Sequence, residues 1–460
     1  MKRTLGEFAR LCGGRLIGTD SAYTDVVSDT RALTASQLFV ALRGPHFNGN
    51  DFLASALALR AAGAVVDAAQ PVALPQIVVR DTQAALERAA RAWRADFAGP
   101  LVGVAGSNGK TTAKEMTAAI LGEAGDCLAT RGNLNNHIGV PLTLLRLEPT
   151  HRFAVVEMGA NHAGEVAALV SLANPSVGMI TNAGAEHLEG FGSLEGVARA
   201  EGEMVAGLAA TATAVINADD AFAQLWRDLT RAQVVTFGVR ASADFSASEV
   251  RAAVGADGFR THFRLQAPQG SVRIELALGG EHNVVNALAA AAASVSAGAT
   301  LEQVASGLAR VRAVSGRLQF RQAKSGAWLI DDSYNANPSS VRAAIEVLSS
   351  LAGRRWLVLG DMAELGEHAA QAHAEIGEFA RERGVERLYA TGALMARAAE
   401  SFGAGAQWYP DVGALSAALT QALGAAGAEV RLLVKGSRFN RLERVVATLS
   451  ADGVAVTGRH

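Results

Sequence analysis

Short apolar runs alternate with longer segments of mixed apolar and polar residues along most of the chain. In its middle part the apolar runs occupy 101–105, 153–157, 177–181, 213–217 and 233–238. Apolar runs of this length predict buried strands, and the segments between them predict helices. Strands that alternate with helices are typical of a parallel sheet with helices on both faces, so the sequence predicts an α/β fold.

The same alternation precedes and follows this middle part. Before it, strands are expected at 38–42, 64–66 and 77–79, and helices at 51–63 and 82–97. After it, strands are expected at 328–331, 355–359, 387–390 and 431–434, with helices between them. Residues 244–278 differ, because polar and apolar residues alternate there with the two-residue period of a half-exposed strand. We expect an antiparallel appendage in that region and an alanine-rich helix at 283–297.

The 460 residues are too many for one core, and roughly 150 residues per domain suggests three domains. Half of the residues are hydrophobic and 19% are charged, which excludes a mostly disordered chain. The pair Gly99–Pro100 interrupts the pattern, and a second series of strands and helices starts near Val314. We expect domains at 1–98, 99–313 and 314–460, each of the α/β class and the last of them Rossmann-like.

Charge and cysteine content narrow the classes of function. The net charge of −2 argues against nucleic-acid binding, which needs a basic surface. Cys12 and Cys127 are too few for a disulfide framework or a structural zinc site. Glu7 and Arg10 stand where a signal peptide would have its apolar core, and no apolar stretch is long enough to span a bilayer. We expect a cytoplasmic monomer without membrane insertion.

Lysine is rare in this chain. The 42 basic residues include only the lysines Lys2, Lys110, Lys114, Lys324 and Lys435. A GC-rich genome explains the excess of arginine. A lysine that persists against this bias is expected where a compact ammonium fits and a planar guanidinium does not.

A glycine-rich loop lies between the strand at 101–105 and a helix predicted at 111–124. Its residues are Gly106, Ser107, Asn108, Gly109, Lys110, Thr111 and Thr112. The backbone N–H groups of such a loop cradle phosphate oxygens, Lys110 would neutralise the β- and γ-phosphates, and the Thr111 hydroxyl would bind Mg²⁺. The strict Walker pattern fails because position 104 is valine. An ordinary glycine turn that caps a helix is the alternative.

Polar residues downstream are candidates for the rest of an ATP site. Glu157 ends the strand at 153–157, where a carboxylate can face Mg²⁺ at the carboxyl edge of a parallel sheet. Asn133, Asn135 and Asn136 form an amide cluster that suits a polar substrate, and His187 is a candidate metal ligand or phosphate donor. The alternatives are a solvated acid, asparagine turns and a surface histidine.

Three polar loops follow strands of the third segment, at 331–338, 360–366 and 435–438. Each alone would be an ordinary loop. Because the carboxyl ends of parallel strands form the ligand edge of an open α/β sheet, the three together predict a binding site there.

These stretches together resemble the Mur ligases of peptidoglycan synthesis, over nearly the whole chain. The most discriminating strings are Asp-Ser-Tyr-Asn-Ala-Asn-Pro at 332–338 and Gly-Asp-Met-Ala-Glu-Leu-Gly at 360–366. Further matching pieces lie at 28–31, 39–44, 48–52, 106–112, 114–116, 133–139, 141–143, 155–159, 181–192, 280–283, 316–317 and 435–438. They are most similar to the member that adds D-alanyl-D-alanine to UDP-N-acetylmuramoyl-tripeptide.

The resemblance implies an ATP-dependent ligase that uses Mg²⁺. The γ-phosphate of ATP would activate the terminal carboxylate of the tripeptide, and the amine of D-alanyl-D-alanine would attack the acyl phosphate. Catalytic and metal-binding roles are implied for Lys110, Thr111, Glu157, His187 and Glu201. Because the reacting groups come from different domains, domain closure would be required.

The resemblance also implies which residues bind each substrate. ATP would contact 106–112 and His282, Asn283, Asn286, Arg317 and Asp332. The UDP substrate would contact Ser28, Thr30, Arg31, Asn48, Gly49, Asn50, Asn135, Asn136 and Thr181. The dipeptide would contact Asn335, Asn337, Lys435, Ser437 and Arg438, and arginine can grip its carboxylate with two hydrogen bonds.

Two departures from the family pattern stand out. Asn48 and Asn50 replace residues that are often Asp and His in the uridine loop. Glu201 stands where the family commonly has a lysine that becomes carbamylated, and it would present a carboxylate without that modification. A glutamate is shorter than a carbamylated lysine by roughly 3–4 Å, a gap that a water on Mg²⁺ can bridge. A solvated helix acid is the alternative for Glu201.

Two other functions remain open. One is a ligase of the same architecture that adds a different amino acid or makes polyglutamate. The Asp-Asn-Pro-Arg string of the sister enzyme that adds diaminopimelate is absent. The other is a P-loop ATPase that acts as a switch, without acceptor chemistry.

Overall fold

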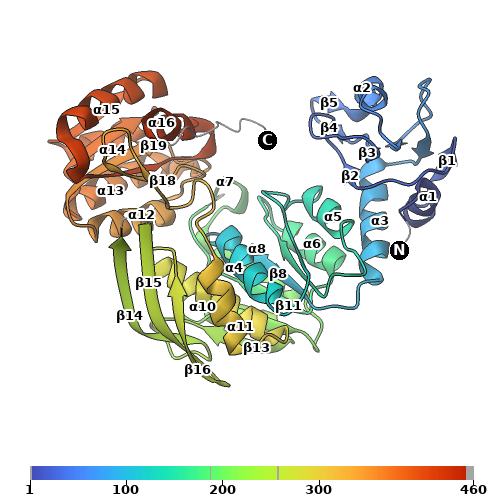
Figure 1. The fold of residues 1–460 in the computed structure, drawn as a ribbon, viewed down its shortest axis with the longest axis horizontal. Coiled ribbons are helices and arrows are strands. Elements are labelled where there is room, and N and C mark those ends of the chain that lie inside the picture. Colours follow the sequence, from blue (N-terminus) through green and yellow to red (C-terminus); the bar gives the residue numbers. More distant parts are fainter. Residues whose placement is uncertain (1–2, 187, 256–257, 452–460) are drawn as a thin grey trace.

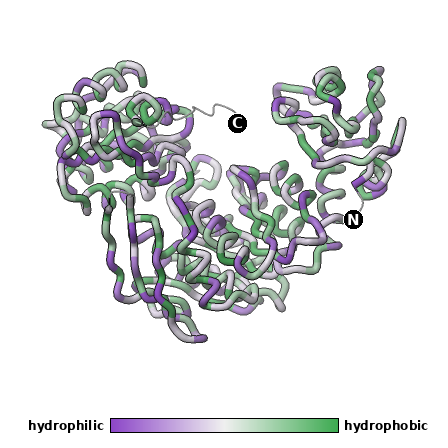
Figure 2. The backbone as a smooth tube through the Cα atoms, viewed as in Figure 1, coloured by the Kyte–Doolittle hydropathy of each residue, from purple (hydrophilic) through white to green (hydrophobic). Residues whose placement is uncertain are grey.

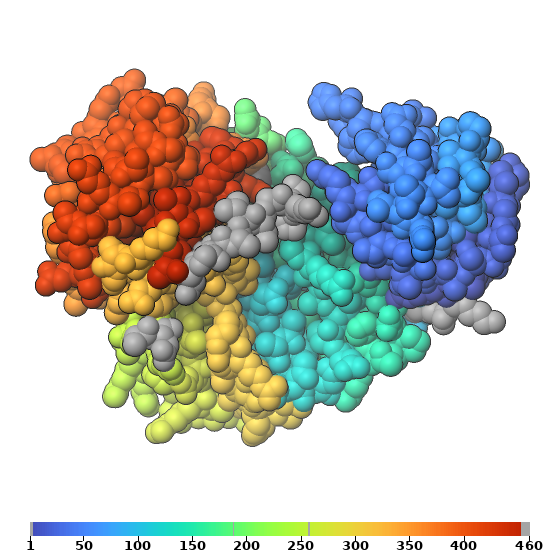
Figure 3. Space-filling view, turned by 45° about the horizontal axis from the view of Figure 1, so that its top comes forward, coloured from blue at the N-terminus to red at the C-terminus, as the bar shows by residue number. Residues whose placement is uncertain are grey.

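The computed structural model describes residues 3–186, 188–255 and 258–451. The candidate His187 therefore lies outside the described residues. Three sheet-containing parts follow one another along the chain, and Figure 1 shows the first and the last on opposite sides of the middle one. The space-filling view shows the first and the last as separate lobes (Figure 3). Of the helices in the described ranges, none has both the length and the apolar character that crossing a membrane requires.

The first part contains a five-stranded sheet of order β1-β7-β6-β3-β2, in which only β1 runs antiparallel to its neighbour. Its strands are β1 (Arg15–Ile17), β2 (Val26–Val27), β3 (Leu38–Val40), β6 (Gly63–Val66) and β7 (Gln76–Val78). A small hairpin, helices and one 3-10 turn complete it: β4 (Arg43–Gly44), β5 (Phe47–Asn48), η1 (Gly49–Phe52), α1 (Leu5–Cys12), α2 (Leu53–Ala58) and α3 (Thr82–Ala95). The helix expected up to residue 63 ends at Ala58, because Arg60 takes a left-handed φ of 60°.

The middle part confirms the predicted parallel sheet, with order β13-β12-β11-β8-β10-β9. Its strands are β8 (Leu101–Ala105), β9 (Cys127–Ala129), β10 (Phe153–Glu157), β11 (Val177–Ile180), β12 (Thr213–Asn217) and β13 (Gln233–Phe237). Its helices are α4 (Lys110–Gly122), α5 (Gly139–Leu144), α6 (Glu165–Ala173), α7 (Leu188–Phe191), α8 (Leu194–Ala206), α9 (Ala223–Leu229), α10 (Glu281–Ser296) and α11 (Leu301–Arg310).

Alternate residues of the central strands pack on opposite faces of this sheet. Val102 and Val104 join one apolar cluster with residues of α4 and α10. Leu101 and Ala105 join another with residues of α5, α6 and α8, and this second cluster continues into α3 of the first part. The continuous core fixes the start of the middle part against the first, and Trp93 Nε1 donates to Leu147 O across it at 2.9 Å.

The antiparallel appendage is also confirmed, as β14 (Ser246–Gly255), β15 (Gly258–Ala267) and β16 (Gly270–Leu276). Hydrophilic and hydrophobic residues are mixed along these strands (Figure 2), in accordance with the predicted alternation. Phe259, at the start of β15, packs with Leu318 and Ile345 in the core of the third part. The appendage therefore contacts the third part as well as the middle one.

The third part has a six-stranded sheet of order β17-β18-β22-β19-β20-β21, parallel except for β17. Its strands are β17 (Gln319–Gln322), β18 (Trp328–Asp332), β19 (Arg354–Gly360), β20 (Arg387–Thr391), β21 (Ala406–Tyr409) and β22 (Val430–Lys435). Its helices and 3-10 turns are α12 (Pro338–Ser349), η2 (Gly366–His368), α13 (Ala369–Glu382), α14 (Met395–Phe402), α15 (Val412–Ala426), η3 (Gly427–Glu429), η4 (Arg438–Asn440) and α16 (Glu443–Leu449). Each predicted sheet thus lies within one predicted domain, while the domain boundaries stay a prediction.

Candidate active site

The glycine-rich loop joins β8 to α4, as expected for a phosphate loop. Gly106 and Gly109 have φ angles of 121° and 83°, which side chains rarely adopt. A Cβ at Gly106 would lie 2.1 Å from Thr181 Oγ1, and one at Gly109 would lie 2.3 Å from Asn286 Oδ1. Only glycine therefore fits at these two positions.

The first half of the loop is bound by its neighbours. The N–H groups of Ser107 and Asn108 donate to Asn182 O and Asn182 Oδ1, at 2.9 and 3.0 Å. Gly106 N–H donates to Glu201 Oε2 at 2.6 Å. These three donors already have protein acceptors, whereas 109–112 lie at the N-terminus of α4, where backbone N–H groups favour phosphate. Contact of the whole loop with phosphate stays a prediction.

Lys110 lies at the centre of this site. Its Nζ donates to Gly106 O and to Ser107 O, the latter at 3.1 Å, and forms an ion pair with Glu186 Oε1 at 3.2 Å. Burial opposes the charge, but Glu186, Glu201 and Glu157 outweigh it and raise the pKa of Lys110. Lys110 is therefore a permanently charged ammonium beside the loop.

Glu157 is buried at the carboxyl end of β10, next to β8. Its Oε1 accepts a hydrogen bond from Asn135 Nδ2 at 2.8 Å, while Oε2 is buried without a partner among the described residues. A buried carboxylate oxygen in this position suits Mg²⁺, which prefers one or two carboxylates together with substrate phosphates. The described residues form no cluster of three His, Cys, Asp or Glu side chains that could hold a metal by themselves.

Glu201 lies on α8 with only 6% of its surface exposed. Burial raises its pKa from the ordinary 4.5 to about 7, with Lys110 opposing the shift and Glu186 adding to it. The solvated-acid alternative is therefore wrong. Glu203, two residues further on, accepts from Gly164 N–H and Ala167 N–H and faces α6 instead.

The amide side chains expected to bind substrates have different placements. Asn135 orients Glu157, but Asn136 Oδ1 accepts from the N–H groups of Ile138 and Gly139, which is ordinary turn chemistry. Thr181 Oγ1 donates to Asn108 O at 2.7 Å and braces the loop. Neither Asn136 nor Thr181 gains support as a contact of the UDP substrate.

The start of α10 carries three expected ATP contacts, of which Asn286 lies beside the loop. Asn286 borders Gly109 and donates to Asn283 Oδ1 at 3.3 Å, and both asparagines are 5% exposed. Burial, with Lys435 nearby, lowers the pKa of His282 to about 4, so this half-buried imidazole is neutral at pH 7.

Residues of the third part reach the phosphate loop directly. Arg317 Nη2 donates to Thr111 Oγ1 at 3.0 Å, and its guanidinium lies 4.5 Å from the centre of the Tyr334 ring. Asn337 Nδ2 donates to Asn108 Oδ1 at 2.9 Å. The sequence did not predict this contact, since it placed Asn337 with the dipeptide.

The remaining dipeptide candidates fall into two groups. Lys435 is buried, pairs with Asp332 Oδ2 at 2.7 Å and donates to Asn335 O at 2.9 Å. Ser437 is also buried and donates to Ala336 O at 3.0 Å. In this structure both side chains bond to neighbouring strand ends. The expected contact was with the dipeptide. Arg438 is exposed, 5.7 Å from the centre of the Tyr334 ring.

The other residues expected to bind UDP lie in the first part, without a direct bond to the phosphate loop among the described contacts. Arg31 pairs with Asp29 at 2.7 Å, which holds the pKa of that carboxyl below its usual value. Asn48 Oδ1 accepts from Asn50 Nδ2, which also donates to Asp67. Gly49 packs on the backbone of Ala41 and Leu42. Ser28 and Thr30 lie in the same loop as Arg31.

Sequence reasoning missed Glu186 and Asn182. Both lie in the loop after β11, whose register with β8 places that loop beside the phosphate loop. The sequence did contain a signal for them, since polar residues directly follow the strand that pairs with β8.

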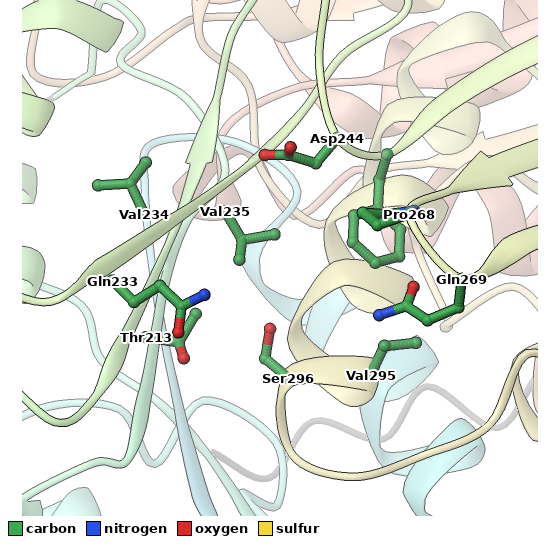
Figure 4. A pocket seen from close by; sticks show the side chains of 10 residues that line it. Thr213, Gln233, Val234, Val235, Asp244, Pro268, Gln269, Val295 and Ser296 are labelled. Carbon is green, nitrogen blue, oxygen red and sulfur yellow. The ribbon is translucent and has the colours of Figure 1, made fainter.

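One surface hollow of this region lies away from the loop. It has a volume of about 330 Å³ and is lined by residues that include Thr213, Gln233, Asp244 and Ser296 (Figure 4). Thr213 and Gln233 are the first residues of β12 and β13, so the hollow lies at the edge of the sheet opposite the carboxyl ends. We assign the active site to the loop and not to this hollow.

Two family models match the chain, the Mur ligase middle domain at 104–294 and the Mur ligase, glutamate ligase domain at 316–438. The UDP-N-acetylmuramoyl-tripeptide--D-alanyl-D-alanine ligase of Escherichia coli (strain K12) is 43% identical over 98% of this chain and 99% of its own length. The enzyme of the same name from Bacillus subtilis (strain 168) is 36% identical over 87% of each chain.

Solved structures of similar proteins have the same architecture. MurF from Acinetobacter baumannii has a TM-score of 0.89 and 32% identity, over 97% of this chain and 98% of that chain. The MurF ligase from Thermotoga maritima in complex with ADP has a TM-score of 0.78 and 26% identity, over 92% of this chain and 96% of that chain. These similarities confirm the α/β architecture expected from the sequence.

Proposed function

The chain belongs to the Mur ligase family, and we propose that it joins D-alanyl-D-alanine to UDP-N-acetylmuramoyl-tripeptide with the energy of ATP. The observation that carries the proposal is the meeting of two parts of the chain at the phosphate loop. Arg317 and Asn337 of the third part bond to Thr111 and Asn108 of the loop. A ligase needs this arrangement, since the phosphorylated acceptor and the attacking amine must come together.

The loop residues would stabilise the charge that moves during phosphoryl transfer. The tripeptide carboxylate attacks the γ-phosphorus, and ADP leaves. Lys110 and the N-terminus of α4 stabilise the phosphate charge. The amine of the dipeptide then attacks the acyl carbon, and phosphate leaves as the amide forms. Thr111 and Glu157 would hold Mg²⁺, which would neutralise phosphate charge, and Glu201 is a candidate for a second ion.

Phosphate release measured with each acceptor tests the proposed function. We expect little phosphate from ATP alone or with either acceptor, and rapid release with UDP-N-acetylmuramoyl-tripeptide and D-alanyl-D-alanine together. Release without acceptors would instead indicate an ATPase switch. Release that responds only to another amino acid would indicate a different ligase of this architecture.

We assign the dipeptide carboxylate to Arg438, the exposed candidate after β22. We expect Arg438→Ala to raise the KM for D-alanyl-D-alanine roughly tenfold or more, because hydrogen bonds to charged groups contribute about 1.5–3 kcal/mol. The KM for ATP should change far less. Steady-state kinetics with each substrate varied in turn measure both constants.

Arg444→Ala is the matched control, since Arg444 is another exposed arginine, on α16. It should leave both KM values near those of the wild type. If Arg438→Ala raises the KM for ATP and leaves that for the dipeptide unchanged, Arg438 belongs to the nucleotide site.

A further inference from the structure

Glu186 connects the phosphate loop to the third part of the chain. One carboxylate oxygen pairs with Lys110 Nζ at 3.2 Å, and the other accepts from Asn337 Nδ2 at 3.4 Å. The Glu186 side chain is only 12% exposed, so water competes little for these contacts. A single carboxylate is therefore shared between the lysine of the loop and the first turn of α12.

Asn337 fixes the start of α12 against the loop. Its Oδ1 caps the helix by accepting from Ser340 N–H at 2.8 Å, and its Nδ2 donates to Asn108 Oδ1. Asn108 Nδ2 in turn donates to Ser339 Oγ at 3.0 Å. Two hydrogen bonds thus hold α12 on the loop, and the longer contact with Glu186 is a third.

Lys110 cannot serve all its acceptors and a nucleotide at once. An ammonium has three protons, and in this structure Gly106 O, Ser107 O and Glu186 accept them. A phosphate at Lys110 must displace one of these acceptors. The contact with Glu186 is the longest of the three, and its loss leaves the loop backbone unchanged. Glu186 is then free to bond more closely with Asn337.

We propose that Glu186 and Asn337 are positioning residues that couple phosphate binding at Lys110 to the docking of α12 on the phosphate loop. Docking holds Arg317 at Thr111, so nucleotide at Lys110 would strengthen the contact by which the third part completes the site. The use of this coupling rests on the proposed ligase function. The coupling itself can be measured with ADP alone.

Two variants test the two sides of this coupling separately. Glu186→Gln alters the contact with Lys110, and Asn337→Asp alters the contacts of α12 with Asn108 and Glu186. Glutamine removes the charge that competes for Lys110, so the Kd for ADP should fall about threefold, the effect of a weak ion pair. Aspartate keeps the helix cap but cannot donate to Asn108 or Glu186, so this variant should fold normally. Isothermal titration calorimetry measures the affinities without any acceptor substrate.

Hydrogen exchange reports the docking itself. In the wild type, ADP should slow amide exchange in the first turns of α12. We expect both variants to lose at least half of this protection. In the double variant, the amide introduced at position 186 can donate to the carboxylate introduced at position 337, so part of the protection should return. Glu189→Gln makes the same chemical change at an exposed position on α7 and should behave like the wild type.

The outcomes separate the coupling from the proposed function. Unchanged protection in both variants, or weaker ADP binding in Glu186→Gln, would overturn the coupling. If ADP affinity and protection respond as expected but no dipeptide is ligated, the coupling stands and the proposed function fails.

Discussion

Lys110→Ala should lower kcat by a factor on the order of a hundred or more, the usual cost of removing a key electrostatic group from an active site. Lys110 is the ammonium that the structure places among Glu157, Glu186 and Glu201. Without it, a triphosphate would approach these carboxylates with no compensating charge. Phosphate release with both acceptors present measures the effect.

Two controls belong with this experiment. Lys324→Ala changes an exposed lysine whose Nζ donates to Thr448 O, and it should leave turnover near the wild type. Lys110→Arg keeps the charge but puts a planar guanidinium where Gly106 O and Ser107 O enclose a compact ammonium, so it should also be impaired. Near-normal turnover of Lys110→Ala would remove the phosphate-loop assignment.

The scarcity of lysine predicted positions where a compact ammonium fits and a planar guanidinium does not. Lys110, Lys114 and Lys435 are each enclosed by carbonyl or carboxylate oxygens, as expected for a compact ammonium. Lys114 is fully buried, with Nζ 2.8 Å from Thr130 O and paired with Glu115. Lys324 is exposed, so the rule holds for three of the four lysines in the described part of the chain.

The buried parallel strands were predictable because both of their faces need apolar residues. The edge strands were not. β9 has only three residues, and β17 and β21 lie at the edges of the third sheet, where Gln319 and Gln407 can face solvent. Such strands have at most a short apolar run, and their pairing is set by the neighbouring strand.

The site was predictable where a residue is tied to a strand end or to a loop pattern. Lys110, Glu157 and the glycines follow from local sequence. The positions of Glu186, Asn182 and Asn337 depend on strand register and on the docking of α12, which no local pattern contains. The same long-range packing directs Lys435 and Ser437 inward, although their loop position suggested a ligand contact.

Glu201 occupies a position where a carboxylate can act in place of a carbamylated lysine. Its Oε2 accepts from Gly106 N–H, and Lys110 is close enough to oppose the rise of its pKa. We expect Glu201→Ala to lower kcat at least tenfold, since it removes both the loop contact and an anion near the phosphates. The wild-type rate should not respond to added bicarbonate. Full activity of Glu201→Ala, or loss of wild-type activity when CO₂ is removed, would contradict this role.

A stability measurement tests the same carboxylate without substrates. Between pH 4.5 and about 7 the folded protein holds a proton on Glu201 that the unfolded chain has released. The contribution of this proton to the free energy of unfolding is fully present below pH 4.5. It is lost as the pH rises to about 7, by an amount on the order of 3 kcal/mol. Denaturant unfolding at several pH values should show this decline in the wild type. Glu201→Gln, which can still accept from Gly106 N–H but does not titrate, should show less of it. Equal pH dependence in both proteins would mean that the pKa of Glu201 is the same in the folded and unfolded states, as for a carboxylate exposed to water.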